Sequence, residues 1–201
     1  MDQTIALLCL QAMNNSPQAL HDKLEAALVE LASTRKFLIG LSGGLDSVVL
    51  LHAMVRLRDH SGVAFQLRAL HINHQLQDQA QSWEQHCQRQ CAMLDVEFIS
   101  TRVEISGSTG IENAAREARY REFEAELLPD EELLLAHHRD DQMETLLLRL
   151  VRGSGSRGLS GIPRSRVLGA TRLLRPLLDI DREELQSYAE SEQLIWVEDH
   201  S

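Results

Sequence analysis

The residue types best suited to chemistry first occur together at Ser42–Ser47, where the sequence reads SGGLDS. The apolar run before it, Phe37–Leu41, has the composition of a buried strand, and Val48–Val55 has that of a helix. A turn between a strand and a helix aims backbone N–H groups at one point, which suits an anion. Gly43 and Gly44 let such a ligand approach the main chain closely. The stretch therefore predicts a phosphate site, and a turn without a ligand is the alternative.

Asp46 is the unexpected residue of this turn, because a carboxylate and a phosphate repel each other. A Mg²⁺ ion between them removes the conflict, and Mg²⁺ is commonly held by one carboxylate together with phosphate oxygens. The turn lacks the Gly-Lys-Ser/Thr ending of a Walker loop, and the only lysines, Lys23 and Lys36, precede it. A side-chain cation that reaches the phosphates from later in the chain is therefore an arginine.

A second polar cluster, HHRDDQMET at residues 137–145, directly follows the strand-like run Glu132–Ala136. Asp141 and Glu144 are three residues apart, so a helix places their carboxylates on one face near its start. Two carboxylates beside two histidines are compatible with a metal site, an acid–base pair or a receptor for an ammonium group. A general base, or Mg²⁺ shared with Asp46, fits an ATP site better than zinc does. The zinc alternative would use His137, His138, Asp141 and His71.

Two pairs of residues are further candidates for contacts with a nucleotide. His71 and His74 come at the end of a strand-like run, and the carboxyl ends of parallel strands form the usual ligand site of open α/β sheets. A pair of structural loop histidines is the alternative. Arg116 and Arg119 share one face of a predicted helix at residues 112–127. Surface salt bridges are the alternative for these arginines.

The net charge of −10 is unusual for a protein that binds nucleic acid, but the charge is unevenly distributed. Residues 145–178 contain seven arginines and no acid, which is typical of a local phosphate-binding face. A solvated loop that carries arginines is the alternative. Four glycines between residues 153 and 161 predict a loop that a substrate can approach closely.

The composition indicates an ordinary soluble chain, with 201 residues of which 43% are hydrophobic and 25% charged. No apolar run has transmembrane length. The first residues contain an acid and no basic start, which argues against a signal peptide. Cys9, Cys87 and Cys91 form no C-x-x-C pair, so reduced thiols in a cytoplasmic protein are expected, with a metal or redox site as the alternative.

The alternation of strand-like and helix-like runs predicts a doubly wound α/β domain with a mostly parallel sheet of about five strands. Residues 1–36 are expected to form an N-terminal helical extension, and residues 37–201 the main domain. Ser16 and Pro17 have the residue types of a helix start within that extension.

The last elements can be predicted in more detail. Residues 171–178 contain Pro176, which predicts an edge strand or an extended segment. A closing helix follows, and Asp181 and Glu184 have the spacing of a capping box at its start.

The SGGxDS pattern resembles the phosphate-gripping motif of the PP-loop ATP pyrophosphatases, which adenylate a substrate with ATP. A longer set of motifs narrows the resemblance to the bacterial tRNA(Ile)-lysidine synthetases, because the matches follow that family's order over nearly all of residues 37–201. The matching stretches are SGGLDS at 42–47, HINHQL at 71–76, ENAAREARY at 112–120, AHHRDDQMET at 136–145, RGSGSRGLSGI at 152–162, RPLL at 175–178 and WVED at 196–199.

This resemblance implies an enzyme that uses ATP to adenylate the C2 oxygen of the first anticodon cytidine of tRNA(Ile), after which free L-lysine displaces AMP. Asp46 would bind Mg²⁺, and Asp141 would act as acid/base toward lysine, with Glu144 beside it. The implied catalytic residues are Asp141, Glu144, Asp46 and Arg116. The implied ATP-binding residues are Ser42, Gly43, Gly44, Leu45, Asp46, Ser47, His71, His74, Arg116, Arg119 and His137. The implied tRNA-binding residues are Arg152, Arg157 and Arg175.

The resemblance also implies ATP and Mg²⁺ as cofactors, the anticodon stem-loop of tRNA(Ile) and free lysine as partners, a cytoplasmic location and no membrane, and it allows a homodimer. The family continues past Ser201 into tRNA-holding domains, so residues 37–201 would be the PP-loop catalytic domain alone. A PP-loop tRNA thiolation enzyme is one alternative, although such enzymes carry C-x-x-C pairs, which this sequence lacks. A module that binds ATP without turnover is the other.

Overall fold

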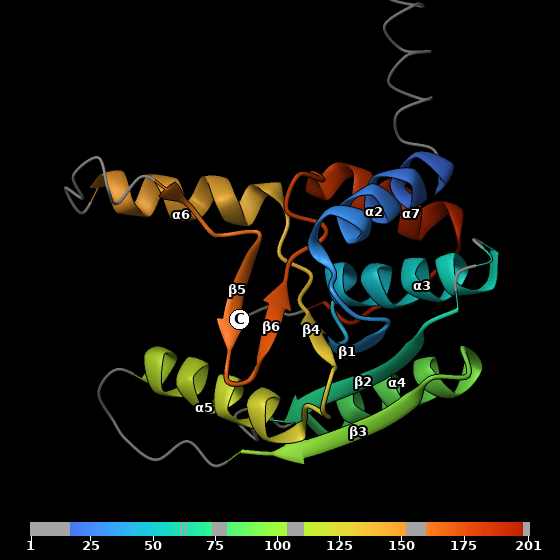
Figure 1. The fold of residues 1–201 in the computed structure, drawn as a ribbon, viewed down its shortest axis with the longest axis horizontal. Helices are drawn as coiled ribbons and strands as arrows, with labels where there is room; N and C mark the ends of the chain where they lie inside the picture. Colours follow the sequence, from blue (N-terminus) through green and yellow to red (C-terminus); the bar gives the residue numbers. More distant parts are fainter. Residues whose placement is uncertain are drawn as a thin grey trace, which may run out of the picture.

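The computed structural model describes residues 17–60, 62, 64–73, 80–103, 111–151 and 160–198. A six-stranded sheet with the order β3-β2-β1-β4-β6-β5 forms its centre (Figure 1). The strands are β1 Lys36–Gly40, β2 Gln66–Asn73, β3 Glu97–Arg102, β4 Glu132–Leu134, β5 Ser165–Leu168 and β6 Thr171–Leu174. The helices are α2 Pro17–Leu31, α3 Leu45–His60, α4 Ala80–Met93, α5 Ile111–Glu126, α6 Arg139–Val151 and α7 Arg182–Ser191.

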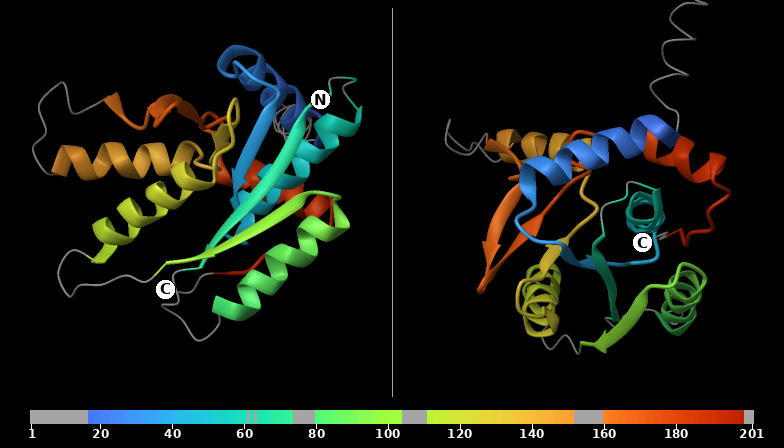
Figure 2. Two further views of the ribbon diagram at one scale, coloured as in Figure 1. Left: turned by 60° about the horizontal axis from the view of Figure 1, so that its bottom comes forward. Right: turned by 45° about the vertical axis from the view of Figure 1, so that its right-hand side comes forward.

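Neighbouring strands of the sheet are parallel except for β5, which pairs antiparallel with β6. The side chains of β1 alternate between two core layers. Phe37 and Ile39 pack in the layer that contains α2, α3, α4 and α7, whereas Leu38 packs with Phe123 of α5. Figure 2 shows α3 and α4 on one side of the sheet and α5 on the other. The predicted doubly wound, mostly parallel α/β fold is confirmed.

The predicted N-terminal helix is present as α2 and begins at Pro17. A proline suits the first turn because its missing N–H would have no partner within the helix. The apolar face of α2, which includes Leu20 and Leu24, is buried in the same core layer as α3 and α7. Residues 1–16 lie outside the described residues, so the predicted cap at Ser16 and the state of Cys9 are not tested.

The outer edge of the sheet corrects two predictions. Residues 165–168 form an additional strand, β5, so the sheet has six strands rather than about five. The segment predicted as an edge strand is β6, and it lies between β4 and β5. Pro176 does not interrupt this pairing because β6 ends at Leu174. β5 gives a weak sequence signal because it is four residues long and only Leu168 is buried.

The predicted N-terminus of α7 is confirmed. The Asp181 carboxylate accepts a hydrogen bond of 3.0 Å from the N–H of Glu184. The Glu184 side chain forms an ion pair with Lys23 of α2. The N–H of Arg182 donates to the Asp140 carboxylate at 3.0 Å. The first turn of α7 is thereby connected to both α2 and α6.

α6 presents polar side chains to the protein and apolar side chains to solvent. Gln142 donates a hydrogen bond to the carbonyl of Ile162, and Arg149 donates one to the carbonyl of Gly161, each at 3.0 Å. Met143 and Leu147 are exposed. Hydrogen bonds, rather than apolar burial, therefore hold this helix in place. No helix within the described ranges is both long enough and apolar enough to cross a membrane.

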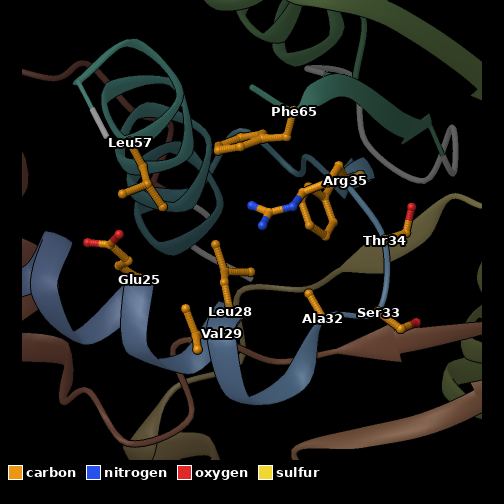
Figure 3. A pocket seen from close by; sticks show the side chains of 10 residues that line it. Glu25, Leu28, Val29, Ala32, Ser33, Thr34, Arg35, Leu57 and Phe65 are labelled. Atoms are coloured by element: carbon orange, nitrogen blue, oxygen red, sulfur yellow. The ribbon is translucent and has the colours of Figure 1, made fainter. Parts of the chain in front are cut away.

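A cavity of about 360 Å³ lies at the amino edge of the sheet, between α2, α3 and the starts of β1 and β2 (Figure 3). Leu28, Leu57 and Phe65 line it, and the Arg35 guanidinium points into it. Ligands of open α/β sheets bind at the opposite, carboxyl edge, so this cavity is separate from the candidate site described below.

A buried tyrosine connects three helices on one face of the sheet. The hydroxyl of Tyr188 in α7 lies 3.0 Å from Nε2 of His21 in α2 and 2.9 Å from Nδ1 of His52 in α3. A hydroxyl has one proton, so one ring nitrogen accepts it and the other donates its own. The ring whose nitrogen accepts this proton is therefore neutral. Burial is the main cause that lowers the pKa of His21 and of His52 below 6.5.

These lowered pKa values predict a pH-dependent stability. Between the folded-state pKa and 6.5 the unfolded chain binds more protons than the folded one. The free energy of unfolding contributed by these histidines is therefore complete above pH 6.5 and is lost as the pH falls through this window. Urea unfolding at a series of pH values should show a smaller loss toward acid for the His21→Gln/His52→Gln variant than for wild type. His60→Gln, at the exposed end of α3, is the control and should keep the wild-type slope.

Gly40 lies at the end of β1, just before the predicted phosphate site Ser42–Ser47, which we call the phosphate loop. A Cβ atom at Gly40 would be 2.6 Å from Leu135 Cδ2 and 2.9 Å from Phe123 Cζ. Gly40→Ala should therefore lower the free energy of unfolding by about 1–3 kcal/mol, the usual cost of overpacking. Chemical denaturation measures this loss. In a Leu135→Ala background the same substitution should cost less, because its nearest obstacle is gone. An equal cost in both backgrounds would show that steric overlap with Leu135 is not the cause.

Candidate active site

The two motifs predicted to do chemistry meet at the carboxyl edge of the sheet. β1 leads through residues 41–44 into α3, and β4 leads through residues 135–138 into α6. β1 and β4 are adjacent and parallel. The chain passes from β1 outward to β2 and β3, and from β4 outward to β6. The strand order therefore reverses between β1 and β4, which is where doubly wound sheets bind their ligands.

The phosphate loop is shaped from within by Ser47. Its hydroxyl accepts hydrogen bonds from the N–H groups of Ser42 and Gly43, each at 3.2 Å, and donates one to the carbonyl of Gly44 at 3.0 Å. Gly43 has a φ of +92°, and a Cβ atom there would be 3.0 Å from the Sγ of Cys87. Ser47 is buried. Its hydroxyl is thus part of the loop's framework, while N–H groups of the first turn of α3 remain for an anion.

Two segments that are distant in the sequence form hydrogen bonds with this loop. The Nδ1 of His71 lies 2.9 Å from the carbonyl oxygen of Leu41, and burial lowers the pKa of this ring. The neutral ring donates to that carbonyl and so fixes the start of the loop. The N–H of Val197, near the end of the described chain, donates to the carbonyl of Gly43 at 2.9 Å. His71 is 5% exposed, so it holds the loop rather than presenting a polar tip to solvent.

His138 lies between the carboxylates of the two motifs. Its Nε2 is 3.6 Å from Asp46 Oδ2 and 3.7 Å from Asp141 Oδ2. Its Nδ1 accepts a hydrogen bond from the N–H of Asp140 at 3.2 Å, which places the proton on Nε2. The N–H of His138 donates to Asp141 at 2.8 Å. Burial alone would lower the pKa of His138, but the carboxylates of Asp46, Asp141 and Asp140 outweigh it and raise the pKa.

The surroundings of Asp46 fit a cation. Its Oδ1 atom is buried and has no hydrogen-bond partner among the described residues. A carboxylate oxygen in that state is suited to a metal ion that phosphate oxygens also bind. The described part of the chain contains no group of three or more His, Cys, Asp or Glu side chains that could hold a metal ion. The zinc alternative therefore has no support there.

His137, the neighbour of His138, faces the opposite kind of charge. Burial and the guanidinium groups of Arg175, Arg116 and Arg119 lower the pKa of His137 to about 4. Arg175 is 3% exposed and donates to His137 Nδ1 at 3.3 Å. The two adjacent histidines thus mark the border between an acidic half of the site and a basic half.

The structure brings several of the predicted site residues together and places others apart from them. Asp46, Asp141 and the phosphate loop lie together, and Arg116, Arg119 and Arg175 surround His137. Glu144 is exposed on α6. Arg175, which was predicted to bind tRNA, is buried. His74, Arg152 and Arg157 lie outside the described residues.

Sequence reasoning missed two residues of the site. His138 was considered only as a zinc ligand, although its position next to His137 in the same motif was a usable signal. Arg166 was counted only as one of the arginines in the basic segment. Its guanidinium carbon lies 4.2 Å from the ring centroid of Tyr120. Cys87 and Cys91, which were expected to be reduced thiols, are unpaired and buried in α4, and burial raises the pKa of each thiol to about 12.

Known protein sequences are similar to this chain over most of its length. A PP-loop domain model matches residues 16–201. The chain is 51% identical to a tRNA(Ile)-lysidine synthase of Photorhabdus laumondii, over 86% of this chain and 39% of that protein. It is 49% identical to the tRNA(Ile)-lysidine synthase of Coxiella burnetii, over 89% and 40%, respectively. The resemblance to this group of synthetases is confirmed.

Solved structures show the same fold at low identity. The U34-tRNA thiolase NcsA of Methanococcus maripaludis, which carries a [4Fe-4S] cluster, superposes with a TM-score of 0.69 at 17% identity, covering 89% of this chain and 64% of that one. The NMN synthetase of Francisella tularensis superposes with a TM-score of 0.58 at 17% identity, covering 90% and 72%. These similarities concern the fold alone.

The extent of the matches differs between the family and the individual relatives. The chain spans about two-fifths of the length of the curated relatives that it matches. The family model covers all but the first 15 residues. Together with the glycine turn at the carboxyl end of β1 and the paired motif after β4, this match shows that the chain belongs to the PP-loop domain family.

Proposed function

We propose that the chain carries the catalytic machinery that joins free lysine to C2 of the wobble cytidine of tRNA(Ile), at the expense of ATP. One observation carries this proposal. A phosphate loop and a pair of carboxylates, Asp46 and Asp141, from two different motifs converge on His138. An ATP-dependent ligation needs both parts, because one activates the acceptor and the other handles the incoming amine. The names of the relatives supply the substrate.

The first step is the attack of the cytidine C2 oxygen on the α-phosphorus of ATP, with release of pyrophosphate. N–H groups at the start of α3 and the hydroxyl of Ser42 would hold the phosphates. Asp46 would hold Mg²⁺, which when bound offsets negative charge on the phosphate oxygens. Arg116 and Arg119, on the other side of His137, would stabilise charge that develops on the α-phosphate.

The second step is the attack of the lysine side-chain amine on C2. The C2–O bond breaks, and the former cytidine oxygen leaves as part of AMP. An ammonium group must lose a proton before it can attack. Asp141 is the candidate acceptor, because its carboxylate is fixed by the N–H of His138 at the start of α6. Glu144, one turn further on and exposed, would receive the ammonium group.

The same proposal covers the remaining expectations. The substrates are ATP, free lysine and the anticodon stem-loop of tRNA(Ile), and the location is the cytoplasm. Arg152 and Arg157 would contact the tRNA. Residues 37–201 would form the catalytic domain with residues 1–36 as its helical extension, and a homodimer stays a prediction.

A tRNA thiolation enzyme is the second candidate, because the thiolase NcsA shares the fold. The chain has no C-x-x-C pair to hold sulfur or a cluster. Its cysteines in α4 are buried, and their pKa values are raised to about 12, which disfavours the nucleophilic thiolate.

The test is to incubate the chain with ATP, Mg²⁺ and an unmodified tRNA(Ile) transcript, with and without lysine, and to measure pyrophosphate and AMP. Lysine-dependent AMP release together with a lysine-sized mass increase of the wobble nucleotide is expected. Turnover that requires a sulfur donor instead of lysine would favour the thiolation enzyme. ATP binding without any turnover would leave a nucleotide-binding module.

A further inference from the structure

Four arginines that have no acidic partner among the described residues gather in the basic half of the site. The guanidinium carbons of Arg166 and Arg116 lie 4.2 and 5.3 Å from the ring centroid of Tyr120. Arg175 and Arg119 are close enough for their charges to interact with Tyr120 and Arg116. No ion pair within the described ranges of the chain involves any of these four arginines.

Two other arginines of the basic segment 145–178, which contains Arg166 and Arg175, are neutralised. Arg164 pairs with Glu30 and Asp179, and Arg172 pairs with Glu132. Among the described residues, the lack of an acidic partner for Arg166 and Arg175 is therefore a property of their place and not of the segment. Like charges in a partly buried site repel one another, and after burial the nearby guanidinium groups are the next cause that lowers the pKa of His137. Such an arrangement is costly to the folded protein unless an anion occupies it.

The fold places this cluster apart from the phosphate loop. Arg175 directly follows β6, and antiparallel pairing brings the start of β5, with Arg166, to the same carboxyl edge. The phosphate loop follows β1, with β4 between β1 and β6. Two to three strand spacings correspond to roughly 10–14 Å. Arg166 and Arg175 are therefore positioned for an anion other than the phosphates held by the loop.

The exposure of the cluster indicates a large ligand. Arg116 and Arg166 are exposed. Arg175 is buried, and it donates hydrogen bonds to His137 and to the carbonyl of Pro163. The Tyr120 ring orients both exposed guanidinium groups through cation–π contacts. A buried arginine next to exposed guanidinium groups, which an aromatic ring holds in place, suits a phosphodiester in a chain that continues on both sides.

We propose that Arg166 and Arg175 bind a backbone phosphate of single-stranded RNA next to the base that enters the site, beside Arg116 and Arg119, which would face the α-phosphate of ATP. This inference rests on the proposed function. It assigns a role in substrate binding to Arg166 and a positioning role to Tyr120, which holds the guanidinium groups but does not touch the RNA.

The test measures binding of a fluorescein-labelled anticodon stem-loop of tRNA(Ile) by anisotropy, over a series of salt concentrations. Arg166→Gln should weaken binding about tenfold at low salt, as expected for a lost charged hydrogen bond. It should also reduce the slope of log K against log salt by about 0.7–0.9, the contribution of one neutralised phosphate. Arg164→Gln is the matched control, because Arg164 lies two residues away and is already paired. It should keep the wild-type affinity and slope.

Two further arms separate the sources of phosphate and the kinds of role. ATP affinity, measured by calorimetry, should be unchanged in Arg166→Gln. Tyr120→Leu should weaken RNA binding less than Arg166→Gln does and keep the salt slope, because all the charges remain. Thermal unfolding shows that each variant is folded.

Three outcomes would overturn the inference: an unchanged RNA affinity and slope in Arg166→Gln, a loss of ATP affinity in place of RNA affinity, or no RNA binding by wild type. In each case lysine-dependent AMP release by wild type would leave the proposed function standing. Absence of that release with a normal Arg166 effect would sink the proposed function and leave the RNA site.

Discussion

Replacing Asp141 by asparagine should lower lysine-dependent AMP release by about 10²- to 10⁴-fold, the usual contribution of a positioned acid–base group. The substitution keeps the size of the side chain and an oxygen that can accept the N–H of His138 at the start of α6. It removes the carboxylate that would take the proton from the lysine ammonium group. ATP binding should survive, because the phosphate loop belongs to the other motif. Steady-state AMP release and calorimetric ATP binding measure the two effects separately.

Asp140→Asn is the matched control for this prediction. Asp140 is the neighbour of Asp141 in the same helical turn, and it is more exposed. Its carboxylate accepts the N–H of Arg182 at the start of α7, and an amide oxygen can do the same. We expect a change in turnover of about threefold or less, since only a charge at the edge of the site is lost. Comparable losses in both variants would show that the overall charge of the first turn matters, rather than a base at Asp141.

Replacing Asp46 by asparagine should abolish the dependence of ATP binding on Mg²⁺ and lower turnover by about 10²- to 10³-fold. The basis is the several kcal/mol by which a bound metal stabilises charge at phosphorus, at 1.36 kcal/mol for each factor of ten. The Oδ1 atom of Asp46 is buried without a partner, so a cation gains a ligand there at little cost. Calorimetric ATP titrations with Mg²⁺ and with EDTA provide the measurement.

Asp59→Asn serves as the control for Asp46, because Asp59 lies on the same helix, α3, and among the described residues its carboxylate pairs with the neighbouring Arg58. It should keep the wild-type response to Mg²⁺. If Asp46→Asn also kept that response, the metal would have to be held elsewhere, and the assignment of Asp46 would fail. Thermal unfolding of both variants checks that neither result comes from loss of the fold.

The elements that carry the chemistry could be predicted because their signals are local. The apolar run of β1, the glycine turn and the start of α3 follow one another within a few residues, and so do β4, the histidine pair and α6. Strand and helix periodicities report burial on one or both faces, which the sequence shows directly. The parallel pairing of β1 with β4 then follows from the general rule for doubly wound sheets.

The edge of the sheet could not be predicted in the same way. β5 has four residues and one buried side chain, so its alternation is too short to recognise. It forms because the antiparallel turn after Leu168 lets it complete its hydrogen bonds on β6. That pairing depends on a neighbour and not on the residues of β5 themselves. With β5 missed, the position of Arg166 at the carboxyl edge was missed as well.

The amino-acid sequence by itself therefore determined the fold class, the PP-loop family and the two motifs, because each depends on residue types at fixed short spacings. Tertiary structure alone decided what the individual polar residues do. His71 supports the loop because β2, the strand beside β1, places it next to Leu41. His138 came to lie between Asp46 and Asp141 because β1 and β4 are adjacent. Among the described residues, Arg164 has acidic partners, Glu30 and Asp179, whereas Arg166 lies against the ring of Tyr120. These neighbours come from distant parts of the chain, so the local sequence does not show them.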